Sequence, residues 1–107
     1  MPKLDPTSLH LPERYRQILL PLLRQHVPQA EVWAYGSRVT DDFYEASDLD
    51  LVVRNRDNLS QPSDGIFDLQ EALVESDIPI QVQVVDWARI PEAFHAEIEA
   101  GYVVVQG

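Results

Sequence analysis

The chain has 107 residues, of which 45% are hydrophobic, and its length and composition predict one folded domain over residues 1–107. Its net charge of −10 disfavours nucleic-acid binding, because phosphate backbones attract basic surfaces, but it suits a metal-chelated nucleotide or a basic protein partner. Without cysteine, a secretion-type apolar segment or a run near ~18 apolar residues, we expect a soluble cytoplasmic protein with no disulfide, thiolate metal site or membrane span.

The first third of the chain predicts a helix followed by a strand. Residues 1–10 contain two prolines and no periodicity, which predicts a loose N-terminal lead-in. From Pro12, a favoured first helical position, apolar residues recur at helical spacing as far as His26. The run EVWAY at 31–35 is rich in β-formers and predicts a strand that ends at Gly36.

The middle of the chain predicts a second strand and a second helix. Residues 48–54 form a strand that opens with acids and continues with apolar residues. Turn-forming residues fill 55–64, and an apolar stripe at helical spacing follows them. Ser63 or Asp64 is expected to cap that helix.

The last third completes a small α/β (α+β) fold. Residues 80–85 read IQVQVV, an alternation that predicts a third strand. Pro91 opens a last helix that Gly101 ends, and residues 102–105 form either a closing strand or a docked tail. The order αββαβα predicts a mixed sheet backed by helices.

A pair of acids and a glycine-containing bend form the candidate site. Asp48 and Asp50 are two residues apart in a strand, so their side chains share a face. Neighbouring carboxylates repel one another, and oxygen ligands of this kind suit Mg²⁺ completed by water and a substrate phosphate. At Gly36 and Ser37, backbone N–H groups can approach a phosphate closely. The pattern therefore suggests a nucleotide held between this bend and one or two metal ions.

These residues resemble a known family. Gly36-Ser37 followed by Asp48-x-Asp50 resembles the active-site pattern of the polymerase-beta-like nucleotidyltransferases. The short length and the sequence VVDW at 84–87 are similar to the minimal nucleotidyltransferases (MNT), which commonly pair with a HEPN-domain protein as a toxin–antitoxin couple. The resemblance covers residues 30–98. It implies an antitoxin enzyme that transfers AMP from ATP to a side chain of the partner toxin.

The resemblance also implies roles for individual residues. Asp48 and Asp50 would be catalytic and would hold two Mg²⁺ ions, which stabilise the entering and departing oxygens of an in-line displacement. Nucleotide binding would fall to Gly36, Ser37, Arg38 and Ser47.

The third catalytic acid of the family pattern corresponds to Gln83 here. An amide oxygen can ligate a metal weakly, but it carries no charge and takes no proton from an attacking hydroxyl. Asp86 is the alternative, although period-two alternation puts it on the face opposite to Gln83 unless a bulge intervenes. This departure leaves two functions open. One is catalysis, and the other is an impaired nucleotidyltransferase fold that neutralises a HEPN ribonuclease by contact alone.

Other interpretations of the motif have less support. Asp48 and Asp50 could be a solvated start of a strand, but the bend before them and the third strand favour a metal site. In haloacid-dehalogenase-type phosphotransferases the paired acids end an apolar strand, whereas here they begin one. Ser37 lacks the neighbouring histidine that a hydrolase nucleophile needs.

Overall fold

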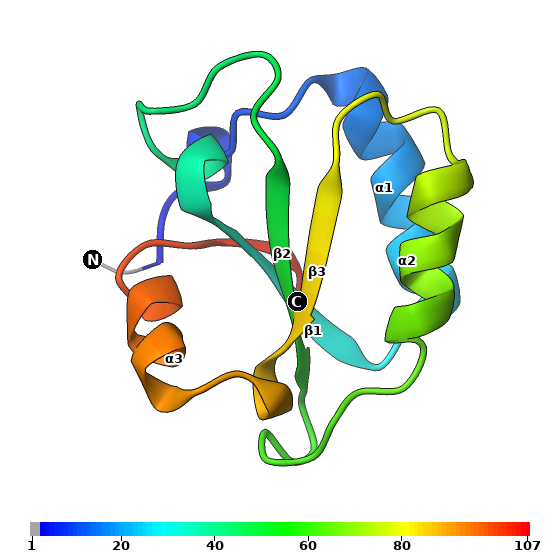
Figure 1. Ribbon diagram of the computed structural model, residues 1–107, viewed down its shortest axis with the longest axis vertical. Coiled ribbons are helices and arrows are strands. Elements are labelled where there is room, and N and C mark those ends of the chain that lie inside the picture. The colour runs from blue at the N-terminus through cyan, green and yellow to red at the C-terminus, as the bar shows by residue number, and fades with distance from the viewer. Residues whose placement is uncertain (1–2) are drawn as a thin grey trace.

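A computed structural model of the protein describes residues 3–107 and confirms the predicted α/β class. Its helices and strands are α1 (Glu13–His26), β1 (Ala30–Tyr35), β2 (Leu49–Asn55), α2 (Ile66–Glu75), β3 (Val82–Asp86), α3 (Glu92–Glu99) and β4 (Val103–Gln106). Short 3₁₀ helices stand at η1 (Pro6–Ser8), η2 (Gly36–Val39) and η3 (Trp87–Arg89). Figure 1 shows how the helices flank the strands.

The strands form a mixed sheet in the order β3-β2-β1-β4. β1 is antiparallel to β2 and β4, whereas β2 and β3 are parallel, so the C-terminal residues form a closing strand. The register pairs Asp50 with Tyr35 on one side and with Gln83 on the other. Since paired residues share a face, these three side chains leave the sheet on the same side.

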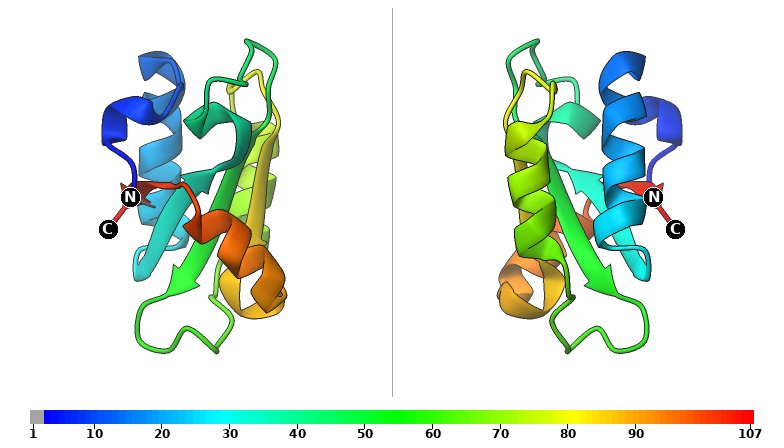
Figure 2. Two further views of the ribbon diagram at one scale, coloured as in Figure 1. Left: turned by 90° about the vertical axis from the view of Figure 1, so that its left-hand side faces the viewer. Right: turned by 90° about the vertical axis from the view of Figure 1, so that its right-hand side faces the viewer.

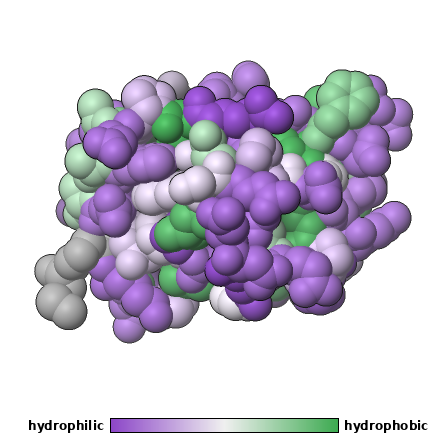
Figure 3. Space-filling view, turned by 90° about the horizontal axis from the view of Figure 1, so that it is seen from below, coloured by the Kyte–Doolittle hydropathy of each residue, from purple (hydrophilic) through white to green (hydrophobic). Residues whose placement is uncertain are grey.

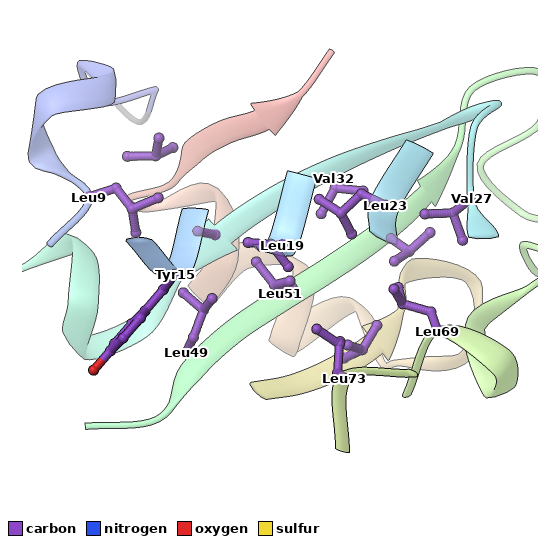
Figure 4. Close-up of a cluster of buried hydrophobic side chains, with 14 of the residues drawn as sticks. Leu9, Tyr15, Leu19, Leu23, Val27, Val32, Leu49, Leu51, Leu69 and Leu73 are labelled. Carbon is purple, nitrogen blue, oxygen red and sulfur yellow. The ribbon is translucent and has the colours of Figure 1, made fainter. Parts of the chain in front are cut away.

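The larger hydrophobic core lies between the sheet and the pair α1 and α2, as Figure 2 shows. Residues at i, i+4 and i+8 of α1 form its buried stripe, namely Tyr15, Leu19 and Leu23. They meet alternate residues of β2 and the inner face of α2 (Figure 4). Leu49, Leu51 and Val53 are fully buried there, so the intervening residues of β2 point to the opposite face.

A second cluster holds α3 against that opposite face. Trp33 of β1 stacks on Tyr102 with ring centroids 3.8 Å apart and meets Trp87 edge-on at 5.6 Å. The Arg54 guanidinium lies 3.9 Å from the Trp33 ring centroid and 4.6 Å from that of Trp87, and it pairs with Glu31 across the strands. Cation–π contacts of this kind let a charge lie in a largely apolar layer.

The expected loose lead-in is instead packed over residues 3–10; residues 1–2 lie outside the described part. Leu9 is 5% exposed in the larger core, and Leu4 N–H donates to the Tyr102 carbonyl at 2.8 Å. Asp5 caps η1 by accepting the Thr7 N–H, and this hydrogen bond lowers the pKa of Asp5. The sequence of this segment shows no periodicity because single residues, and not one face of a helix, hold it against the rest of the protein.

One face of the molecule is mainly hydrophilic (Figure 3). The face seen from below is largely purple, with separate hydrophobic patches between the polar residues (Figure 3). Across residues 3–107, no helix has the length and apolar character required to cross a bilayer.

The start of α2 depends on Gly65, and the prediction of a Ser63 or Asp64 cap is wrong. Gly65 is the N-cap with φ +89°, and no side chain caps this helix. A Cβ on Gly65 would stand 2.0 Å from the carbonyl oxygen of His26 at the end of α1. The helices α1 and α2 therefore approach each other closely enough to require glycine at this point.

Replacing Gly65 with alanine should lower the free energy of unfolding by about 2–3 kcal/mol, because a left-handed backbone and a steric overlap both act against the Cβ. Gly101→Ala is the matched control, since its Cβ would meet Leu4 at an ordinary 3.8 Å. Urea unfolding curves measure both variants. Equal effects of the two substitutions would contradict this account of Gly65.

Candidate functional site

The candidate site is built where the end of β1 turns next to the start of β2. Gly36 follows β1 with φ +81° and opens the short 3₁₀ helix η2. A Cβ on Gly36 would stand 2.4 Å from Oδ2 of Asp50. The Asp50 carboxylate therefore occupies the space that any other side chain at position 36 would fill.

Asp48 and Gln83 extend this site along the sheet. Gln83 Nε2 donates to Asp48 Oδ2 at 3.1 Å, and Gln83 is the register partner of Asp50. The structure thus brings together Gly36, Asp48, Asp50 and Gln83, as parity predicts, and Ser37 is next to them in η2. Their catalytic, metal-binding and nucleotide-binding roles stay predictions.

The structure gives Arg38 a role other than the predicted contact with a triphosphate. Arg38 is 2% exposed, and its guanidinium donates to three carbonyl oxygens: Ser47 at 2.9 Å, Glu45 at 2.8 Å and His10 at 2.6 Å. His10 N–H in turn donates to the Arg38 carbonyl at 2.8 Å. These bonds occupy the side chain and tie the loop before β2 to the N-terminal segment.

Ser47 also supports that loop. It is 4% exposed, and its hydroxyl accepts the N–H of Tyr44 at 2.9 Å. Its own N–H donates to the Tyr44 carbonyl at 2.9 Å. Ser47 therefore helps to fix where Asp48 begins the strand, and its nucleotide-binding role stays a prediction.

Asp86 lies outside the site. It pairs with Val53, three residues beyond the Asp50–Gln83 pair, and therefore faces the other side of the sheet. Its carboxylate accepts the N–H groups of Ala88 and Ser63 at 3.3 and 3.2 Å and contacts Arg89 at 3.5 Å. Asp86 is a structural residue at the start of η3, and it does not replace the missing third acid.

Comparisons with known proteins identify the family. Residues 18–106 match the family described as "Polymerase beta, Nucleotidyltransferase". The chain belongs to this nucleotidyltransferase family. A Haemophilus influenzae protein called "Probable protein adenylyltransferase MntA" is 41% identical over 91 residues, which are 83% of this chain and 76% of that protein.

A solved structure supports the fold of this nucleotidyltransferase. It is described as "Crystal structure of the toxin-antitoxin with AMP-PNP", and it superposes with a TM-score of 0.68. The match covers 86% of this chain and 73% of the other, at 18% identity. At that identity the likeness concerns the fold alone.

The two acids of this nucleotidyltransferase are close enough for the charge of Asp48 to affect the ionisation of Asp50. Burial and, secondarily, the charge of Asp48 raise the pKa of Asp50. Tyr35 lies beside Asp50 in the register, and burial together with the Asp50 charge raises its pKa to about 12. Tyr35 therefore stays neutral. Sequence analysis missed this residue, although its position directly before the bend gave a signal.

Three side chains could ligate a metal at this site, and two of them, Asp48 and Asp50, suit Mg²⁺. Asp48 and Asp50 supply the hard carboxylate oxygens that Mg²⁺ prefers, and a cation would offset the burial and the Asp48 charge that together raise the pKa of Asp50. Gln83 can add only a neutral amide oxygen. Accordingly, within residues 3–107, no three Asp, Glu or His side chains gather as a metal-binding group.

Asp50→Asn should stabilise the protein at pH 7 in metal-free buffer. The raised pKa means that the folded state holds the Asp50 proton more tightly than the unfolded chain does, for which the pKa is near 3.8. The stabilisation that Asp50 contributes is therefore fully present below pH 3.8 and is lost as the pH rises through the pKa of the folded state. Asparagine does not ionise, so it avoids this loss.

Unfolding free energies measured between pH 3 and 7 check this, with the exposed Asp41→Asn as control. The advantage of Asp50→Asn should shrink toward low pH, and Asp41→Asn should stay close to the original protein. A variant less stable than the original at pH 7 would refute this account of Asp50.

Proposed function

We propose that this chain is a Mg²⁺-dependent adenylyltransferase that moves AMP from ATP onto a hydroxyl group of a partner protein and acts as an antitoxin. The observation that carries the proposal is the pair Asp48 and Asp50, in which the Asp50 carboxylate stands against Gly36 and the charge of Asp48 acts on Asp50. The names of the Haemophilus relative and of the toxin–antitoxin structure support this reaction and this setting. The proposed partner is a HEPN-domain toxin.

The reaction joins the acceptor oxygen to the α-phosphorus as the bond from that phosphorus to the αβ-bridging oxygen breaks. Pyrophosphate leaves with the electron pair, and the hydroxyl releases its proton. Bound Mg²⁺ would neutralise charge on the phosphate oxygens. Asp48 and Asp50 would hold the metal, while the Gly36 and Ser37 N–H groups would orient the phosphates. Because Gln83 takes no proton, the nearby proton acceptors are the two carboxylates.

Mg²⁺ should raise the unfolding temperature of the original protein. Binding to the folded state alone stabilises it according to the ratio of metal concentration to Kd, by about 2.7 kcal/mol at 100 times Kd. Asp48→Asn and Asp50→Asn should each reduce the response strongly, whereas Asp41→Asn should keep it. Thermal unfolding with and without Mg²⁺ measures this. An undiminished response in both site variants would exclude the proposed ligands.

Gln83→Asp should increase transfer of label from α-labelled ATP to the HEPN-domain partner by about tenfold or more, because a third carboxylate can ligate metal and accept a proton. Gln61→Asp adds the same charge at an exposed position in the loop after β2 and should leave the rate nearly unchanged. Label on the partner is measured after electrophoresis. No response to Gln83→Asp would count against a catalytic role for position 83.

A second function has a specific observation in its favour. The Gln83 amide donates to Asp48, so a metal ligand is already engaged by a neutral group. An impaired site would leave a binding module that neutralises its partner by contact alone. The labelling experiment separates the two functions, because the module transfers no label while still binding the partner.

A further inference from the structure

One border of the sheet presents backbone groups that no other strand of the described residues pairs with. β3 is the last strand at this border in the described part of the chain. Leu49 N–H donates to the Gln81 carbonyl at 2.9 Å, so alternation directs the backbone groups of Gln83 and Val85 toward β2. Those of Val82 and Val84 consequently point outward. The Gln70 amide already donates to the Val84 carbonyl at 3.1 Å, so an incoming strand would share that acceptor with Gln70 or displace it.

An apolar groove runs beside these groups. It has a volume of about 540 Å³ and lies between β3 and α2. Its apolar lining comprises Leu73, Val74, Ile78, Ile80, Val82, Val84 and Val85. On α2 the side chains of Val74 and Phe67 are 86% and 68% exposed. We call the outward groups of β3 together with this groove the α2–β3 surface.

The charge around this surface has a single sign. Residues 57–88 contain seven acidic residues and no lysine, arginine or histidine. Natural proteins commonly protect a sheet border with lysine, and this border lacks it. Glu71 and Glu75 of α2 are exposed beside Gln70 and Val74, which also line the groove. An occupant must therefore combine apolar side chains with positive charge.

We propose that the α2–β3 surface docks an extended cationic segment of a partner protein, in which apolar residues alternate with lysine or arginine. The segment would add a strand to the sheet by pairing with the outward groups of Val82 and Val84. Its apolar side chains would fill the groove beside Leu73, while its basic side chains would meet Glu71 and Glu75.

The same strand connects this surface to the candidate site. Gln83 lines the groove and also donates to Asp48. A docked strand would lie about 5 Å from β3, on the side away from β2. It would thus bring partner side chains onto the face that carries Asp48 and Asp50. This last consequence rests on the proposed function, whereas the docking itself does not.

The test is a titration of the isotope-labelled protein with a short synthetic peptide in which valine or isoleucine alternates with lysine, followed by amide NMR spectra. The peptide should shift the signals of Val82, Val84 and α2 and slow exchange of the outward amides. A peptide with glutamate in place of lysine should not bind. Absence of binding by the lysine peptide, or shifts confined to other surfaces, would overturn the proposal.

Variants test the two halves of the surface. Val82→Pro removes an outward N–H and leaves the bonds to β2 in place, so affinity should fall about tenfold. Val74→Gln removes apolar groove surface without adding charge, so affinity should fall, and Leu59→Gln is its matched control at an exposed apolar residue in the loop after β2. Unchanged affinity in Val82→Pro and Val74→Gln, with circular dichroism like the original, would exclude this surface.

The titration contains neither nucleotide nor metal, so its outcome is independent of catalysis. Peptide binding without label transfer would retain docking and refute the proposed function. Label transfer without peptide binding would refute the docking proposal and retain the function.

Discussion

The structure depends on one close approach, in which the Asp50 carboxylate takes the space beside the Cα atom of Gly36. Two conditions make it possible: a glycine with positive φ, and a β1–β2 register that pairs Asp50 with Tyr35. A slip of one residue would turn both acids of β2 into the larger core and expose Leu49 and Leu51. The hydrophobic pattern of β2 therefore fixes the position of the site, because burial of these leucines leaves the acids only one face.

The position of the two acids depends on the loop between the bend and β2. The buried Arg38 side chain holds this loop in place through hydrogen bonds to its carbonyl groups. Arg38 meets backbone carbonyls instead of a carboxylate, so its charge is solvated by oriented dipoles and leaves the acid pair uncompensated. A salt bridge to Asp48 would have quenched the repulsion that makes a cation favourable. The separation of Arg38 from the acids thus preserves the electrostatic basis of a metal site.

The local sequence pattern was sufficient to predict which residues of the regular strands share a face. Period-two alternation placed Asp48, Asp50 and Gln83 on one face and argued against Asp86; the register confirms this for Asp50, Gln83 and Asp86, and the Gln83 hydrogen bond confirms it for Asp48. Pattern was insufficient where one residue meets a distant segment. Arg38 was misassigned because the direction of a side chain after a turn depends on carbonyls up to 28 residues away.

The N-terminal segment and Gly65 were misread for the same reason. Leu9 is a single apolar residue in a stretch without periodicity, and the need for Gly65 arises from α1 and not from α2 itself. A sequence window contains neither contact. Tyr35 shows the intermediate case, since its strand was predicted correctly while its importance comes from the partner strand.

Gln83 is the residue at which the electrostatic and structural arguments meet. A third carboxylate at position 83 would stand beside Asp50. Burial and the charge of Asp48 already raise the pKa of Asp50, so a further negative charge would make folding without metal less favourable. The amide avoids that cost and donates to Asp48, but it gives up a charged ligand and a proton acceptor. Since Gln83 also lines the groove beside β3, its neutrality limits the negative charge at the sheet border as well. With Gln83 the protein folds more readily without metal, but its site lacks a third charged ligand. A partner docked along β3, as proposed above, could supply side chains to a site that is incomplete in this way.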